Sequence, residues 1–273
     1  MIRAPEDGSY LVEIAEGVLR LSFNRPEYGN AVPTTAVPHL IALFEAARED
    51  PSVRAILVRG EGRMFSAGGD VAAFRRSLEQ DRAARQADFA ERLPRARRLV
   101  EAVVAFDKPL VVAIRGACAG AGLMYPLAAD VVIGEADATF VFAHQRIGLS
   151  PDGGVSALLP DVVGVRAARR LLVTAATVES EEALRLGLLD EVVEAGTLES
   201  VTLKLARRLA RAPQLAVRTA KRLVAMQAAG ASLADRLDGE TAGIVAAVGD
   251  EDFAEGVRAF MEKRAAVFPS ARG

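Results

Sequence analysis

Two glycine-rich turns constrain the fold of this chain more than any other feature. Residues 63–70 read RMFSAGGD and residues 116–122 read GACAGAG, and each segment follows a short apolar run typical of a strand. Small residues at such a junction allow another backbone or a ligand to approach closely, and they leave main-chain N–H groups free to donate. Two such donors brought together stabilise an oxygen atom that gains negative charge. We therefore expect an oxyanion hole.

Composition limits the class of protein. The chain has 273 residues, of which 51% are hydrophobic, enough for one large core or for one core with a small appendage. A net charge of −2 differs from the basic excess of a general nucleic-acid binder. The single cysteine, Cys118, excludes an internal disulfide and suits a reducing compartment. With no signal-peptide pattern and no apolar run of about 20 residues, we expect a soluble, cytoplasmic protein without a membrane partner.

Strand and helix signals alternate over the first part of the chain, which predicts an α/β fold. Glu16 and Gly17 join the first two strand-like runs as a hairpin. Ser180 is the expected N-cap of a helix that ends at Gly187. The expected strands cover residues 10–15, 18–24, 55–59, 110–114, 131–134, 139–142 and 188–193. The expected helices cover residues 34–49 and, after a polar start near residue 74, the segment up to residue 105.

The pattern changes near residue 197. Helices are expected at residues 198–211, 214–228, 233–248 and 252–267, with no strand between them. Their apolar faces are wide, and a lone helical tail would leave much of that surface in water. We therefore divide the chain into a core domain, residues 1–196, and a helical region, residues 197–273, that packs on a neighbouring subunit.

With both turns in view, the chain resembles the crotonase, or enoyl-CoA hydratase/isomerase, superfamily over nearly its whole length. The order and spacing of several short motifs carry this resemblance. They are NRP at 24–26, NA at 30–31, FSAGGD at 65–70, KP at 108–109, Gly116, GAG at 120–122, Asp130, IGLSPDGG at 147–154 and EALRLGL at 182–188.

The resemblance implies a spiral of ββα repeats that binds an acyl-CoA thioester. It also implies a homotrimer or a dimer of trimers, no metal, and no cofactor other than the coenzyme A carried by the substrate. Two backbone amides, here those of Ala67 and Ala121, would hydrogen-bond the thioester oxygen. Most members carry glycine at the second position, whereas Ala121 adds a methyl group and keeps the N–H.

Hydratases of this superfamily resemble one another in using two glutamates, which this chain lacks. Met124 and His144 occupy the matching positions. One acid remains, because Asp152 matches the acidic residue of isomerase-like and dehalogenase-like members. Asp152 is therefore the expected acid/base, although an aspartate there can also cap the following helix. His144 either orients a substrate group and assists Asp152, or is a structural histidine.

The resemblance also implies residues that bind the substrate. Arg25 and the backbone near Ala31 match positions that contact the nucleotide or the pantetheine, although Arg25 can equally be a surface charge. Phe253 and Phe268 are expected to close a neighbouring pocket or to serve only in helix packing. The remaining expected contacts are Gly68, Gly69, Asp70 and Met124, with Asp70 interpreted mainly as a residue that starts a helix.

The favoured interpretation is an enzyme that shifts a double bond in an enoyl-CoA through an enolate held in the oxyanion hole. The alternatives are an atypical enoyl-CoA hydratase and a non-catalytic acyl-CoA binder. A dehalogenase would need Asp152 as a nucleophile together with an aryl pocket. A serine hydrolase is disfavoured because the chain has only two histidines.

Overall fold

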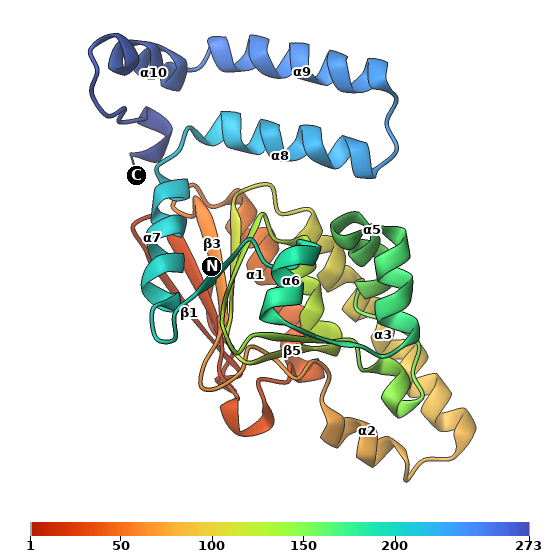
Figure 1. Cartoon of the computed structure of the whole chain (residues 1–273). Helices are drawn as coiled ribbons and strands as arrows, with labels where there is room; N and C mark the ends of the chain where they lie inside the picture. Colours follow the sequence, from red (N-terminus) through yellow and green to blue (C-terminus); the bar gives the residue numbers. More distant parts are fainter. Residues whose placement is uncertain (1, 273) are drawn as a thin grey trace.

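The computed structural model describes residues 2–272 and consists of two β-sheets enclosed by helices (Figure 1). The larger sheet has six strands in the order β1-β2-β3-β4-β6-β9. Its strands are β1 (Tyr10–Ala15), β2 (Val18–Phe23), β3 (Ala55–Gly60), β4 (Leu110–Ile114), β6 (Val131–Glu135) and β9 (Glu191–Val193). Only β1 runs antiparallel to its neighbour, because the two-residue turn at Glu16 and Gly17 reverses the chain.

The smaller sheet pairs three short strands in the order β5-β7-β8. They are β5 (Ala117–Ala119), β7 (Thr139–Val141) and β8 (Thr177–Glu179). The chain passes from β4 in the large sheet to β5 in the small one, and then from β6 to β7 in the same way. Ser66 joins this pattern through a parallel bridge to Cys118 in β5. These alternations form the predicted spiral of ββα repeats.

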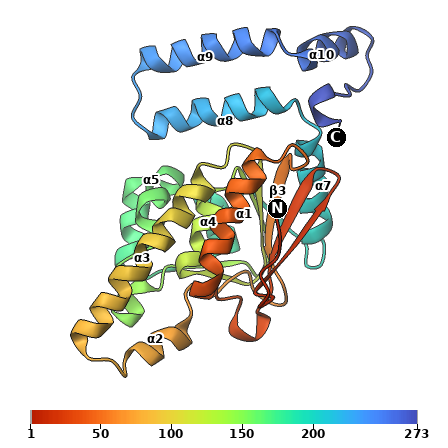
Figure 2. The same cartoon turned by 180° about the vertical axis from the view of Figure 1, so that it is seen from behind.

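Helices cover both faces of the large sheet. Those on the first face are α1 (Val37–Glu49), α3 (Arg82–Val104), α4 (Met124–Ala128) and α5 (Val155–Val173). Side chains alternate along each strand, so Ile56 and Val58 pack in this larger core whereas Ala55 and Leu57 face the opposite side. There they meet α7 (Leu198–Ala210). Figure 2 shows the same fold from behind, with α7 beside the sheet.

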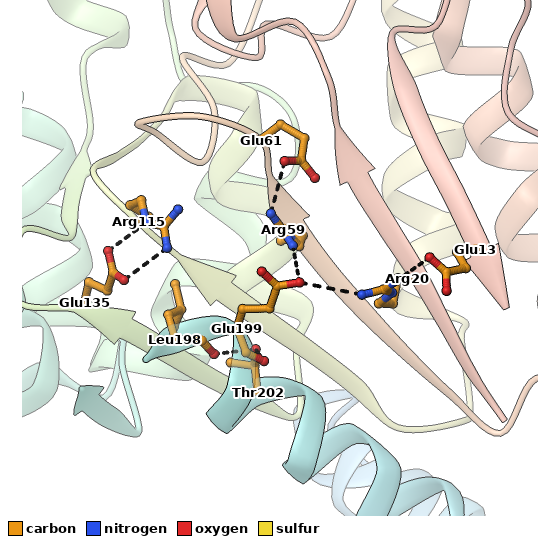
Figure 3. Close-up of polar contacts among 9 residues, drawn as sticks. All are labelled: Glu13, Arg20, Arg59, Glu61, Arg115, Glu135, Leu198, Glu199 and Thr202. Carbon is orange, nitrogen blue, oxygen red and sulfur yellow. Dashed lines mark hydrogen bonds and ion pairs between the residues drawn. The ribbon is translucent and has the colours of Figure 1, made fainter. Parts of the chain in front are cut away.

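A group of charged residues fixes the start of α7 on the sheet (Figure 3). Glu199 pairs with Arg59 of β3 at 2.9 Å and with Arg20 of β2 at 3.6 Å. Behind it, Arg115 and Glu135 form two hydrogen bonds of 2.7 and 3.1 Å. The Arg115 hydrogen bonds hold the pKa of Glu135 below its usual value. This network anchors α7, so the segment after residue 197 starts as part of the core.

Beyond α7, the helices α8 (Gln214–Ala228), α9 (Leu233–Val248) and α10 (Glu251–Met261) extend away from the sheets (Figure 1). No residue of α8 is buried, and α9 buries only Gly243. A Cβ on Gly243 would lie 2.6 Å from the Thr219 side chain, so the glycine allows the two helices to pack closely. The division at residues 196 and 197 remains a prediction.

Several expected elements differ from the structure. Ser180 begins α6 (Ser180–Leu186) and does not cap it, because the N-cap is Glu179 and the Ser180 hydroxyl donates to Ala136 O at 2.8 Å. The polar segment after the first turn is two helices, α2 (Val71–Ser77) and α3. Strands β5 and β8 were not predicted, and the last strand starts at Glu191 instead of residue 188. No helix within residues 2–272 combines the length and hydropathy needed to cross a membrane.

We expect acid to weaken one anchor of the C-terminal segment. Arg264 donates two hydrogen bonds to Glu255, Val267 N donates a third at 2.8 Å, and together they lower the pKa of Glu255 to about 2. A carboxylate whose pKa is lowered by folding stabilises the fold above its unfolded pKa, and this stabilisation disappears as the pH falls through the folded value. Urea unfolding should therefore show Glu255→Gln less stable than the wild type at pH 6, with the difference shrinking below about pH 4.5. The exposed Glu240→Gln is the control, and a difference that does not change with pH would contradict the assignment.

Candidate active site

The two glycine-rich turns lie side by side. Ser66 N donates to Ala117 O at 3.1 Å, and Ala119 N donates back to Ser66 O at 2.8 Å. The hydroxyl of Ser66 is buried, donates to Asn30 O at 3.0 Å and accepts from Gly68 N at 3.1 Å. The first turn is therefore held from two sides.

Gly68 allows the close approach of the turns. Its φ of +90° lies in the left-handed region that favours glycine. A Cβ added there would lie 2.5 Å from Ala119 O and 3.0 Å from Ala121 N. Any side chain at residue 68 would force the turns apart.

The hydrogen bonds of the first turn decide which amide can serve a ligand. Ala67 N donates to Gly29 O at 2.7 Å, and Gly68 N is taken by the Ser66 hydroxyl. Within residues 2–272, Gly69 N donates a hydrogen bond to no acceptor. The expectation that Ala67 donates to the substrate therefore does not fit the geometry, whereas Gly69 has a free amide on the same turn.

The second free amide belongs to Ala121. This residue lies in the first turn of a 3₁₀ helix, Gly120–Leu123, that runs directly into α4. The first N–H groups of a helix have no partner within it and carry its partial positive charge. Ala121 N is bonded to no acceptor in the described part of the chain. Gly69 and Ala121 thus offer two backbone donors on adjoining turns.

These turns border a mainly apolar cavity of about 150 Å³. It brings together six of the residues singled out in the sequence, namely Gly68, Gly69, Asp70, Ala121, Met124 and Asp152. Helix α3, with Phe74 of α2, forms the opposite wall. The described residues contain no cluster of three or more His, Cys, Asp or Glu side chains placed to hold a metal ion.

Asp152 lies next to the second amide donor. A Cβ on the adjoining Gly153 would be 3.1 Å from Ala121 Cα, so the two backbones are in contact. The Asp152 carboxylate does not cap α5, whose N-cap is Gly154 without a side-chain cap bond. That alternative is wrong. Asp70, the other acid at the cavity, caps α2 by accepting from Ala73 N at 3.1 Å.

His144 stands behind Asp152. Its Nε2 is 3.2 Å from Asp152 Oδ1, and a carboxylate can only accept in this contact, so the hydrogen is on Nε2. The His144 side chain is 6% exposed and that of Asp152 is 47% exposed. Nδ1 is buried and has no hydrogen-bond partner among the described residues. His144 therefore contacts the acid and does not line the cavity.

Comparison with known proteins places the chain in a family. The enoyl-CoA hydratase/isomerase family model matches residues 13–271. The chain belongs to the enoyl-CoA hydratase/isomerase family. Like its relatives in the crotonase superfamily, it is an enzyme that acts on acyl-CoA.

Some relatives are named as isomerases and others as hydratases. The chain is 31% identical to the trans-2-decenoyl-[acyl-carrier-protein] isomerase of Streptococcus mutans, over 93% of this chain and 95% of that one. It is 36% identical to a Rhodobacter capsulatus protein assigned as an enoyl-CoA hydratase, over 92% and 94% of the two chains. A crystal structure assigned as an enoyl-CoA hydratase of Streptomyces coelicolor A3(2) superposes with a TM-score of 0.89, at 35% identity, and covers 97% of this chain and 96% of that one.

Other residues expected from the family resemblance lie outside the cavity. Arg25 stacks on Tyr28 at 4.4 Å and donates to Ala31 O at 3.2 Å, on the loop that Gly29 ties to the first turn. Phe253 and Phe268 line a separate apolar groove near α10. Their expected role at a neighbouring subunit stays a prediction.

Two further residues support the turns. The sequence assigns no role to Asn30, and it allows Cys118 to be either a small residue of the second turn or a nucleophile. Asn30 is buried with a φ of 55°, and its side chain donates to Glu61 O and Met64 O at 2.8 Å. Asn30 tolerates this conformation better than most side chains, which is the signal that marks it. Cys118 is buried in β5, and burial raises the pKa of its thiol, so it serves as a small core residue.

Proposed function

We propose that this enzyme isomerises an enoyl-CoA by moving its double bond. The observation that carries the proposal is the pairing of two free amides, Gly69 N and Ala121 N, with one carboxylate, Asp152, on a single cavity. Met124 occupies the matching position of one of the two glutamates used by hydratases. A single acid can move a proton between two carbon atoms of the substrate. The hydratases instead use two glutamates to position and activate a water molecule.

The proposed reaction consists of two proton transfers. The thioester oxygen accepts hydrogen bonds from Gly69 and Ala121, and each such donor contributes roughly 10²–10³ in rate. Asp152 removes a proton from the α-carbon of a 3-enoyl-CoA, and the electron pair delocalises onto the thioester oxygen. Asp152 then returns the same proton to the γ-carbon, which leaves the 2-enoyl isomer. Atoms and charge balance without a co-reactant.

The test is an assay of the purified protein with hex-3-enoyl-CoA and hex-2-enoyl-CoA, with products separated by chromatography. Interconversion of the two without 3-hydroxyhexanoyl-CoA supports the proposal. Accumulation of the 3-hydroxy product as the main species identifies a hydratase and overturns the proposal. Binding without turnover of either ester identifies a non-catalytic binder and also overturns it.

We further propose that His144 positions Asp152. Its imidazole donates to Oδ1 from a buried place, so it restrains the carboxylate without contacting the substrate. His144→Gln, which keeps a donor, should lower kcat only a fewfold, whereas His144→Leu should lower it about tenfold or more, with KM nearly unchanged in both. Equal losses in the two variants would contradict a role for the hydrogen bond.

The helical extension supports self-association as a proposal. Phe260 is 86% exposed on α10, and further exposed apolar side chains on α9 include Ile244 and Val245. We expect sedimentation velocity to show a species larger than a monomer, and Phe260→Glu to shift it toward the monomer. Val173→Glu, at a similarly exposed position on α5, is the control. A wild-type monomer at micromolar concentration would contradict this expectation.

A further inference from the structure

Helix α3 lines the cavity over a length that starts near the loop of Asp152 and extends to Arg92. Besides Arg95, the α3 residues that line the cavity follow a helical repeat, namely Phe89, Arg92, Leu93, Ala96, Leu99 and Val100. Val100 packs close to Gly154, because a Cβ on Gly154 would lie 2.7 Å from the Val100 side chain. Arg92 lies eight positions earlier, about 12 Å along the helix axis. The cavity therefore leads from Asp152 toward Arg92.

A series of aromatic contacts connects Gly69, in the first glycine-rich turn, to Arg92. A Cβ on Gly69 would be 3.1 Å from the tip of the Phe74 ring. Phe74 stacks on Phe89, with ring centres 5.9 Å apart and planes 21° apart. The Arg92 guanidinium lies over Phe89, 3.8 Å from the ring centre. A group that follows these rings away from Gly69 meets a cation.

Arg92 carries a charge in an apolar wall of the cavity, and its ion-pair partner is partly exposed to solvent. Its side chain is 20% exposed, and its ion-pair partner is Asp88, at 3.3 Å on the same helix and itself 43% exposed. The buried Nη2 atom makes no hydrogen bond of good geometry within residues 2–272. A partly desolvated guanidinium gains most from a carboxylate, which it binds in a bidentate manner.

The other charged groups on the cavity are less suited than Arg92 to bind a carboxylate. Asp70 accepts from Ala73 N and lies 4.0 Å from Arg76. Arg95 is 58% exposed and pairs with Glu91 at 3.2 Å. Asp152 lies at the opposite end of the cavity, beside Ala121. Arg92 is thus the cation best placed to receive a ligand.

We propose that the acyl group of the substrate ends in a carboxylate that binds Arg92. This inference rests on the proposed function for the reaction, but it concerns recognition of the acyl group. A cavity of about 150 Å³ admits a guest of benzene size, which corresponds to a short acyl group. The substrate class is therefore the mono-CoA ester of a short unsaturated dicarboxylic acid.

The test compares esters that differ only in their distal end. Hex-3-enedioyl-CoA and hex-3-enoyl-CoA form a six-carbon pair, and the corresponding oct-3-enoyl esters form an eight-carbon pair. The wild type should favour the carboxylate member of at least one pair by about 10- to 100-fold in kcat/KM. Arg92→Gln should abolish this preference. Arg95→Gln, on the same helix face, should keep the preference.

A binding measurement separates this inference from the isomerase proposal. Saturated hexanedioyl-CoA and hexanoyl-CoA do not react, so calorimetry compares their Kd whatever the reaction is. Tighter binding of the diacid ester, lost in Arg92→Gln, supports the inference even if no isomerisation occurs. Equal binding of the two esters, or a preference that Arg92→Gln retains, overturns it. Circular dichroism shows whether the variant folds, and Arg92→Lys, which keeps the charge without the fork, should restore part of the preference.

Discussion

Asp152→Asn is expected to lower kcat for isomerisation by about 10²–10⁴, the usual contribution of a general acid–base group. Asparagine has the same shape as aspartate but cannot accept a proton from the α-carbon. Its side-chain oxygen can still accept the hydrogen from His144 Nε2, 3.2 Å away in the wild type. The loss should therefore fall on the chemical step and leave the fold intact.

Two measurements make this expectation sharp. The rate is measured with hex-3-enoyl-CoA, and the Kd of hexanoyl-CoA is measured by calorimetry and should change less than threefold. Asp161→Asn, at an exposed aspartate on α5, is the matched control. Full activity in Asp152→Asn would remove this residue from the mechanism. A large loss of affinity would instead assign it to binding.

Gly68→Ala is expected to reduce kcat/KM by about 10²–10³, the value of one oxyanion donor. The added methyl group would lie 2.5 Å from Ala119 O and 3.0 Å from Ala121 N. Both are backbone atoms, which cannot rotate away as a side chain can. The turn must move, and Gly69 N then no longer points at the atom that Ala121 N binds. The variant should also unfold at lower urea concentration than the wild type.

Gly230→Ala separates strain from contact. Gly230 has a φ of +74°, similar to that of Gly68, but its added Cβ meets nothing within 4 Å. This control should cost only the left-handed strain of about 1–2 kcal/mol and leave activity unchanged. Activity within threefold of the wild type in Gly68→Ala would show that the turns need not touch.

Local patterns identified the elements whose ends are set by their own residues. The expected limits of β4, α8 and α9 match the structure. Gly230 turns the chain between the last two, and Ser232 caps α9 in a capping box. Strands β5 and β8 have three residues each and depend on partners elsewhere in the chain, so no local periodicity reveals them.

The sequence pattern singled out a turn that carries a free amide, but it assigned the donor role to Ala67 instead of Gly69. Which N–H stays free depends on a tertiary hydrogen bond from Ala67 to Gly29 O, and no spacing within the motif encodes it. Arg92 was overlooked for a different reason. Its segment has a polar composition, typical of a solvated helix, whereas one face of α3 lines the cavity.

The contact between Gly153 and Ala121 has a consequence for how such a scaffold diversifies. In the proposed mechanism, activation of the thioester relies on two backbone N–H groups, which every substitution except proline retains. In the same proposal, the side chain of Asp152 determines which product forms, and it belongs to a loop that contacts Ala121. Exchange of the loop that carries Asp152 would therefore change the reaction of the activated thioester. The two amide donors would stay in place, so a new reaction can arise without a new site for activation.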